Sequence, residues 1–140
     1  MSKATTACGD GGARRPEEMT SREIGCEGER LAAEYLARRG YEVLERNWRC
    51  GAGEVDVVAR DGRAHVLVEV KTRLALDEPD QMPELAVGRR KQERYRRLAL
   101  LYLALHPAVT EVRFDVIALN IVGERTARLR HLIGAFEWEG

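Results

Sequence analysis

The period of the hydrophobic positions changes along this chain, and each change marks a predicted element. Over residues 21–39, apolar residues recur every three or four positions, which predicts an α-helix. Thr20 and Glu23 form a T-x-x-E capping box at its start, and Gly40 suits its end. The same period predicts a second helix over residues 89–105. The predicted core-facing residues of this second helix are Tyr95, Leu98, Ala99, Tyr102 and Leu105.

Short runs of alternating or β-branched apolar residues predict five strands. They cover residues 41–48, 54–60, 64–72, 111–119 and 128–133. The second and third runs flank the dipeptide Asp61-Gly62, which is typical of a hairpin turn. The element order α-β-β-β-α-β-β therefore predicts an α/β fold in which helices flank a mixed sheet.

The remaining segments set the boundaries of a single domain. Residues 1–19 are small, polar and rich in glycine, so we expect a disordered N-terminal tail. Residues 20–140 are long enough to bury one core. The segment 74–88 is long and polar for a connection within a compact domain, and a substrate lid and a disordered loop are both consistent with it.

Composition indicates the charge, the redox state and the location of the protein, but it does not indicate a reaction. The 23 basic and 23 acidic residues give a net charge of +0, so any contact with nucleic acid must depend on local patches. Cys8, Cys26 and Cys50 are odd in number and form no C-x-x-C, which indicates reduced thiols and neither a zinc site nor a disulfide framework. No apolar run could span a membrane and no signal peptide is recognisable, so the predicted location is the cytoplasm.

Charged residues interrupt the predicted hairpin, which is the most hydrophobic stretch of the chain. Side chains two positions apart share one face of a strand. Asp56 should therefore project with Glu54, and Glu69 should project with Lys71 from the adjacent strand. The flanking residues predicted to point to the opposite face are Val55, Val57, Val68 and Val70.

Two explanations account for these charges. A charge within a buried strand is unfavourable unless it is paired or binds a metal, so Lys71 could form an ion pair with Glu69 or Asp56. Alternatively, Asp56 and Glu69 hold a hard cation such as Mg²⁺, which binds one or two carboxylates and several waters, while Lys71 orients a water. A third acid could come from the first helix, where periodicity does not choose between Glu27 and Glu29, and either could be a surface glutamate.

The second predicted helix begins with a cluster of positive charge. Its first half carries only Glu93 against six basic residues, which are Arg89, Arg90, Lys91, Arg94, Arg96 and Arg97. Such a cluster is either a solvated face or a phosphate-binding surface, because helix N-termini and basic side chains together attract phosphate. Arg49, in the turn before the hairpin, could add a contact.

Several sequence motifs together resemble one protein family. They are GCEGERLAAEYLARRGY (residues 25–41), RNWR (46–49), GEVD (53–56), VEVKTR (68–73), RRKQ (89–92) and RFDVI (113–117). As a set they are similar to the YraN family of small bacterial proteins, and the similarity extends over residues 21–136. That family in turn resembles the restriction-endonuclease-like superfamily, which includes archaeal Holliday-junction resolvases and RecB-type nucleases. The resemblance implies a restriction-endonuclease-like form of the mixed sheet.

The resemblance also implies a PD-(D/E)xK metal site. Asp56 would fill the first acidic position, Glu69 the second and Lys71 the lysine position. The resolvases place a helix glutamate four residues after a glycine, and Gly25 and Glu29 match this spacing, which favours Glu29 as the helix acid.

The chain departs from these relatives at two places. Val55 precedes the first acid, where the motif has proline. Lys91-x-x-x-Tyr95 stands where RecB-type nucleases carry Q-x-x-x-Y, which argues against a RecB-like exonuclease.

These features lead to one functional hypothesis and two alternatives. The chain is expected to be a Mg²⁺- or Mn²⁺-dependent endonuclease that hydrolyses phosphodiesters in DNA, including branched or structured DNA. The expected catalytic residues are Glu29, Asp56, Glu69 and Lys71, the first three as metal ligands, and the expected phosphate-binding residues are Arg49, Arg89, Arg90, Lys91 and Arg94. No organic cofactor and no membrane partner are expected, and a homodimer would help so small a domain to grip a large substrate. The alternatives are a nucleic-acid-binding or partner-binding module without catalysis and a structural protein whose acids form ion pairs.

Overall fold

A computed structural model describes residues 19–74, 83, 85–122 and 127–135 of the chain. The predicted tail lies outside these residues except for its last position, and so does much of the connection between residues 74 and 88. The described elements are α1 (Ser21–Arg38), β1 (Glu42–Cys50), β2 (Gly53–Asp61), β3 (Ala64–Leu74), α2 (Arg89–Leu105), β4 (Val112–Ile121) and β5 (Ala127–Leu132). The predicted order α-β-β-β-α-β-β is confirmed, and the predicted ranges agree closely with these bounds.

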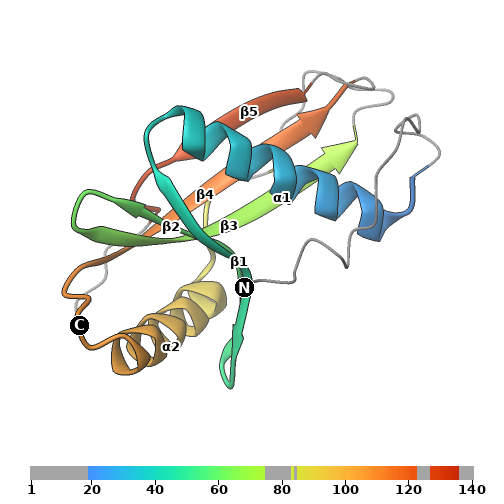
Figure 1. Cartoon of the computed structure of the whole chain (residues 1–140). Helices are drawn as coiled ribbons and strands as arrows, with labels where there is room; N and C mark the ends of the chain where they lie inside the picture. The colour runs from blue at the N-terminus through green and yellow to red at the C-terminus, as the bar shows by residue number, and fades with distance from the viewer. Residues whose placement is uncertain (1–18, 75–82, 84, 123–126, 136–140) are drawn as a thin grey trace.

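The five strands form one mixed sheet in the order β1-β2-β3-β4-β5. Neighbouring strands are antiparallel except β3 and β4, which run parallel. A parallel pair needs a crossover connection, and α2 lies in that connection. In Figure 1, α1 crosses one face of the sheet and α2 lies on the other. The predicted α/β arrangement of a mixed sheet flanked by helices is therefore confirmed.

The sequence signals at both ends of α1 act as predicted. The Thr20 side chain accepts a hydrogen bond from the Glu23 backbone N–H at 3.1 Å, and the Glu23 carboxylate accepts one from the Thr20 backbone N–H at 2.9 Å. At the other end, Gly40 has a φ of 94°, which favours glycine, and the Tyr41 N–H donates to the Leu36 carbonyl at 2.9 Å. This Schellman-type ending turns the chain directly into β1.

Apolar side chains form a separate core on each face of the sheet. The core under α1 includes Ala32, Leu36, Val57, Ala59, Val66, Val68, Ile117 and Leu119. The core under α2 includes Trp48, Val55, Val58, Leu67, Tyr95, Leu98, Tyr102 and Phe114. Both β3 and β4 contribute to both cores, because successive side chains of a strand point to opposite faces.

The last turn of α2 differs from the prediction. Tyr95, Leu98, Ala99 and Tyr102 are buried as expected, but Leu105 is 61% exposed. Leu105 is the last residue of α2, and Leu103 is the leucine of this turn that packs against the core. The assignment of Leu105 to the core is therefore wrong.

Two observations concern location and redox state. Among the helices of the described residues, none is long and apolar enough to cross a membrane. Cys50 is a free, partly buried thiol.

Candidate metal and phosphate site

The regular pairing of β2 with β3 ends next to the charged residues Asp56 and Glu69. The ladder between the two strands extends as far as the pair Val57 and Val68. Beyond this pair, the backbone N–H of Val70 donates to Oδ2 of Asp56 at 2.8 Å. A side-chain carboxylate therefore bridges the two strands where their regular pairing has ended.

The regular alternation of β2 is broken at the same place. Val55 belongs to the core under α2, whereas Val57 belongs to the core under α1. The prediction that these two valines share a face is therefore wrong, because strict alternation requires a regular pleat. On β1, Asn47 has a φ of 56°, and it stands opposite Asp56, since its two neighbours pair with Val57 and Val55. We call Asn47 and Asp56 the irregular rung.

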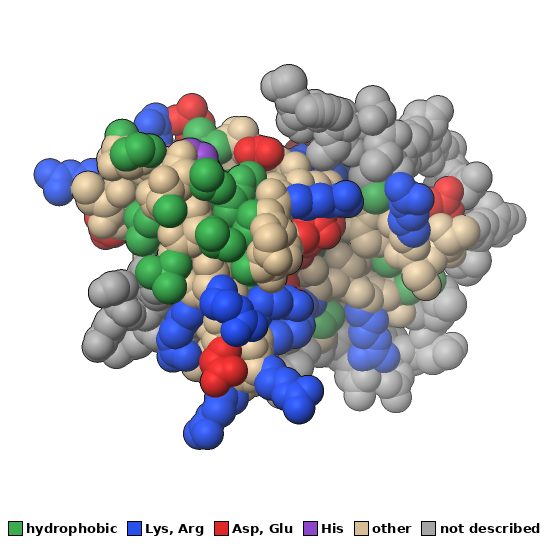
Figure 2. All heavy atoms as spheres, turned by 90° about the horizontal axis from the view of Figure 1, so that it is seen from below, with side chains coloured by type: hydrophobic (Ala, Val, Ile, Leu, Met, Phe, Trp, Pro, Cys, Tyr) green, Lys and Arg blue, Asp and Glu red, His purple; other side chains and the backbone are tan. Residues whose placement is uncertain are grey.

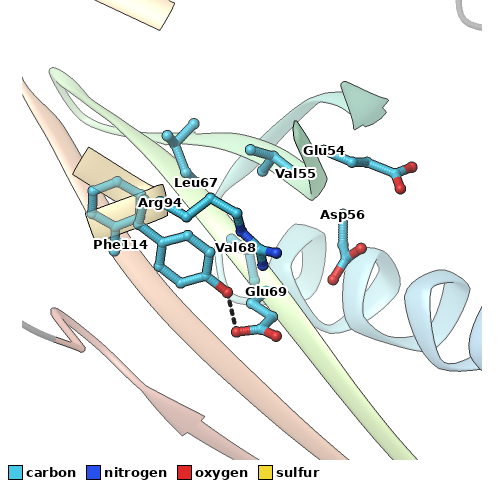
Figure 3. A pocket seen from close by; sticks show the side chains of 9 residues that line it. Glu54, Val55, Asp56, Leu67, Val68, Glu69, Arg94 and Phe114 are labelled. Carbon is cyan, nitrogen blue, oxygen red and sulfur yellow. Dashed lines mark hydrogen bonds between the residues drawn. The ribbon is translucent and has the colours of Figure 1, made fainter. Parts of the chain in front are cut away.

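A pocket of about 200 Å³ lies beside the irregular rung (Figure 3). Its lining residues come from β2, β3, α2 and β4 and are Glu54, Val55, Asp56, Leu67, Val68, Glu69, Arg94, Tyr95 and Phe114. In Figure 3 the side chains of Asp56 and Glu69 extend in the same direction from neighbouring strands, and Arg94 reaches toward them. The fold thus brings together the two acids that the sequence predicts as a pair, and it adds one arginine.

The fold strongly perturbs the ionisation of Asp56. Burial raises the pKa of its carboxyl to about 7, and the negative charges of Glu29, Glu69 and Glu54 act in the same direction. The hydrogen bond from Val70 lowers the pKa but does not cancel these effects. A cation beside this carboxyl would favour its ionised form, because opposite charges stabilise each other.

Two residues of α2 hold Glu69. The Lys91 ammonium lies 2.8 Å from Oε2 of Glu69, and the Tyr95 hydroxyl donates to Oε1. Burial and this hydrogen bond raise the pKa of Tyr95, so the hydroxyl keeps its proton and remains a donor. The sequence predicts phosphate binding for Lys91 and only a core position for Tyr95. Their spacing of four residues, which puts both on one face of a helix, is the signal that could have placed them on one carboxylate.

The structure distinguishes the two candidate glutamates of α1. Glu27 forms an ion pair with Arg30 at 2.7 Å. The side chain of Glu29 is only 17% exposed, and its Oε1 accepts a hydrogen bond from Nδ2 of Asn47 at 3.0 Å. Because its charge also raises the pKa of Asp56, Glu29 is the glutamate of α1 that lies toward the acidic pair.

Lys71 follows Glu69 on β3 and points to the same side of the sheet. Its ammonium donates to the carbonyl of Ala86 at 3.3 Å, and Ala86 lies three residues before the start of α2 in the chain. The ion pair of Glu69 is formed with Lys91. The ion-pair explanation of the charges therefore applies to Glu69, but its cation comes from α2 and not from the E-x-K motif.

Of the other predicted phosphate ligands, one lines the pocket, one contacts a lining residue and two are exposed at the start of α2. Arg94 lines the pocket. Arg49 lies 3.4 Å from the carboxylate of Glu54, which also lines it. Arg89 and Arg90 are exposed in the first turn of α2. Figure 2 shows Lys and Arg side chains gathered on the face of the molecule that carries α2, so the basic surface lies on the same side of the sheet as the pocket.

The donor set meets the minimum requirement for a hard cation. In the described ranges, no three His, Cys, Asp or Glu side chains converge as a preformed metal-binding group, and Asp56 and Glu69 are two carboxylates that line one pocket. Mg²⁺ is commonly bound by one or two carboxylates, with waters and substrate phosphates as its other ligands. An ion at this position would also offset the unfavourable burial of the Asp56 charge.

Comparison with known proteins identifies relatives of this chain. Residues 28–119 match the family described as "Uncharacterised protein family UPF0102". A UPF0102 protein of Thermodesulfovibrio yellowstonii is 42% identical, over 84% of this chain and 99% of its own length. UPF0102 proteins of Beutenbergia cavernae and Geobacter sulfurreducens are 51% and 44% identical, over 79% and 81% of this chain and 93% and 88% of their own. Among solved structures, Pyrococcus furiosus SfsA in complex with Ca²⁺ is similar with a TM-score of 0.36 and 16% identity, over 78% of this chain and 62% of SfsA.

Proposed function

This chain belongs to the UPF0102 family, which is the YraN family that its motifs resemble, and from its acidic site we propose that it is a Mg²⁺- or Mn²⁺-dependent nuclease that hydrolyses phosphodiester bonds in DNA. The observation that carries the proposal is the partly buried Asp56 carboxyl, whose pKa its surroundings raise, beside Glu69. A strongly perturbed acid in a pocket, close to other acids, is typical of functional sites. The basic residues of α2 on the same side of the sheet supply the charge that phosphate binding needs.

Each acidic residue has a distinct part in this proposal. Asp56 and Glu69 would hold the ion, and Glu29 would add a third negative charge from α1. The bound ion would polarise the phosphate and lower the pKa of a water. Lys71, two residues after Glu69 on β3, would orient the attacking water or balance the charge that develops on the phosphate.

Lys91 and Tyr95 would prepare Glu69 for this role in different ways. The Tyr95 hydroxyl fixes Oε1, and with it the orientation of the carboxylate. Lys91 balances the charge of Glu69 through Oε2. A divalent ion would compete with Lys91 for this oxygen, and the released ammonium could then contact phosphate, which is the role that the sequence predicts for it.

The remaining basic residues would position the DNA. Arg94 would contact the phosphate at the reaction centre, because it is the basic residue that lines the pocket. Arg49, Arg89 and Arg90 would bind neighbouring phosphates of the same strand. Phosphate contacts fix the position of DNA without reading its sequence, so we expect cleavage to depend on DNA shape, with branched or structured DNA as the preferred substrate class.

A nucleic-acid-binding module without catalysis is the second candidate. It is favoured by the ion pair between Lys91 and Glu69, which satisfies this carboxylate without a metal. Such a module would bind DNA in a salt-sensitive way and would not cut it with any divalent ion.

Cleavage of a panel of labelled nucleic acids by the purified chain distinguishes the two candidates. The panel holds linear duplex, single-stranded, flap and four-way-junction DNA and an RNA control, each with Mg²⁺, Mn²⁺ or EDTA. The nuclease proposal predicts metal-dependent cleavage that Glu69→Gln and Lys71→Ala abolish. The matched control Glu27→Gln changes a glutamate of α1 that pairs with Arg30, and it should cut like the parent. Equal cleavage by Glu69→Gln and the parent would refute the mechanism, and binding without cleavage would support the module.

A further inference from the structure

Asn47 has a backbone conformation that its place in the chain does not explain. It lies within β1 (Glu42–Cys50), yet its φ is 56°. Among the non-glycine residues that the structure describes, it alone has a positive φ. Strand residues normally have strongly negative φ, and the left-handed conformation is unfavourable for a residue with a Cβ, although asparagine tolerates it better than most. Such a conformation persists where the surrounding contacts favour it, often at a functional site.

The contacts of Asn47 show what this conformation achieves. Its Nδ2 donates to Oε1 of Glu29 at 3.0 Å, and the Arg46 guanidinium lies 3.8 Å from the same oxygen. In a regular strand, successive side chains point to opposite faces. The left-handed residue therefore lets two successive side chains of β1 converge on one carboxylate of α1. The side chains of Arg46 and Glu29 are only 14% and 17% exposed, so these contacts are largely shielded from solvent.

The position of Asn47 connects this carboxylate to the acidic pair. Asn47 stands opposite Asp56 across β1 and β2, since its neighbours pair with Val57 and Val55. On its other side, Asp56 bridges to the Val70 N–H of β3, next to Glu69. The irregular rung, Asn47 and Asp56, thus links Glu29 of α1 to β3, the strand that carries Glu69.

We infer that Asn47 is a positioning residue, whose side-chain amide holds the Glu29 carboxylate toward the divalent ion that Asp56 and Glu69 bind. The inference rests on the proposed function and specifies the third acid of the same site. Residues that orient metal ligands through hydrogen bonds typically change metal affinity by about ten-fold or more when they are removed.

A purely structural link between α1 and β1 would behave differently from a positioning residue. Asn47→Gly separates the two roles, because glycine adopts a positive φ without strain but has no amide to donate. Loss of a structural link would lower the urea midpoint and leave metal affinity unchanged. Loss of a positioning residue would lower metal affinity while the urea midpoint stays close to that of the parent.

A double-mutant cycle on the full chain tests the inference. Mn²⁺ binding is measured by calorimetry for the parent, Asn47→Gly, Glu29→Gln and the double variant, and urea midpoints are measured in EDTA. We expect each single variant to bind Mn²⁺ about ten-fold or more weakly, and the double variant to bind no more weakly than Glu29→Gln alone. The inference would be overturned if Asn47→Gly bound Mn²⁺ as tightly as the parent. It would also be overturned if Asn47→Gly weakened Mn²⁺ binding by the same factor in the Glu29→Gln variant as in the parent. Either result would leave the proposed function standing. A parent chain that binds no Mn²⁺ would overturn the proposed function and this inference with it.

Discussion

Asp56→Asn should make the protein more stable at neutral pH, although it removes a residue assigned to the reaction. The asparagine keeps a side-chain oxygen that can accept the Val70 N–H, and its amide has no charge to desolvate. In the parent, burial raises the pKa of Asp56 from 3.8 to about 7. The folded chain therefore holds this proton more tightly than the unfolded chain.

The direction of the effect follows from the order of the two pKa values. Below about pH 4 the carboxyl is protonated in both states, and its burial is not opposed by charge. As the pH rises from about 4 to about 7, the unfolded chain releases the proton first, so the free energy of unfolding falls. Above about pH 7 both states are ionised and the loss is complete. The difference between 3.8 and about 7 corresponds to about 4 kcal/mol.

Urea denaturation of the parent and the Asp56→Asn variant, followed by circular dichroism in EDTA, measures this difference. The variant should be more stable by about 1–2 kcal/mol at about pH 5 and by up to about 4 kcal/mol at about pH 8. The other titrating groups are present in both proteins, so the change of this difference with pH reports on Asp56. A difference that stays constant between these two pH values would refute the reasoning that burial raises the pKa of Asp56.

Three further substitutions test the packing of α1 against β3 and a buried acid, Asp115, whose pKa is lowered and not raised. Gly28→Ala should lower the free energy of unfolding by about 1–3 kcal/mol, because a Cβ at this position would lie 1.9 Å from Oγ1 of Thr72. A Cβ at Gly25 would meet no atom within 4 Å, so Gly25→Ala should stabilise α1 by up to about 1 kcal/mol. Urea denaturation of both variants compares them, and equal effects would contradict the close approach of α1 to β3. Asp115→Asn should destabilise the fold by about 3 kcal/mol at neutral pH. Burial alone would raise the pKa of Asp115, but its hydrogen bonds, above all the one with His131, lower the pKa overall. The fold therefore stabilises the ionised carboxylate, which the substitution removes. This stabilisation is present above the ordinary aspartate pKa and is lost as the pH falls through the lowered one, so the destabilisation should shrink as the pH is lowered below about 4, and a destabilisation that does not change with pH would contradict the reasoning.

Local signals were sufficient to predict most of the fold. The capping box of Thr20 and Glu23, the C-terminal Gly40 and the Asp61-Gly62 turn all act through residues close in sequence. The acidic pair could also be found, because charges are unusual in an otherwise apolar hairpin. Its position at the end of a strand ladder, however, appears only in the register of β2 and β3.

The features that escaped prediction depend on contacts between distant elements. The hydrophobic pattern contains no sign that Val55 leaves the face of its neighbours or that Asn47 adopts a positive φ, because an irregular rung arises from two strands together. Lys91 forms a hydrogen bond with the carboxylate of Glu69, which lies 22 positions earlier in the chain. That contact depends on where α2 crosses the sheet, and no local pattern encodes this placement.

The most direct test of the central claim, that Asp56 and Glu69 together hold a divalent ion, is Mn²⁺ binding to the parent, Glu69→Gln and Glu27→Gln. The decrease of the free-ion signal in electron paramagnetic resonance measures the bound fraction. We expect the parent and Glu27→Gln to bind Mn²⁺ equally and Glu69→Gln to bind it about ten-fold or more weakly. Equal binding by all three proteins would show that the acidic pair is not the metal site.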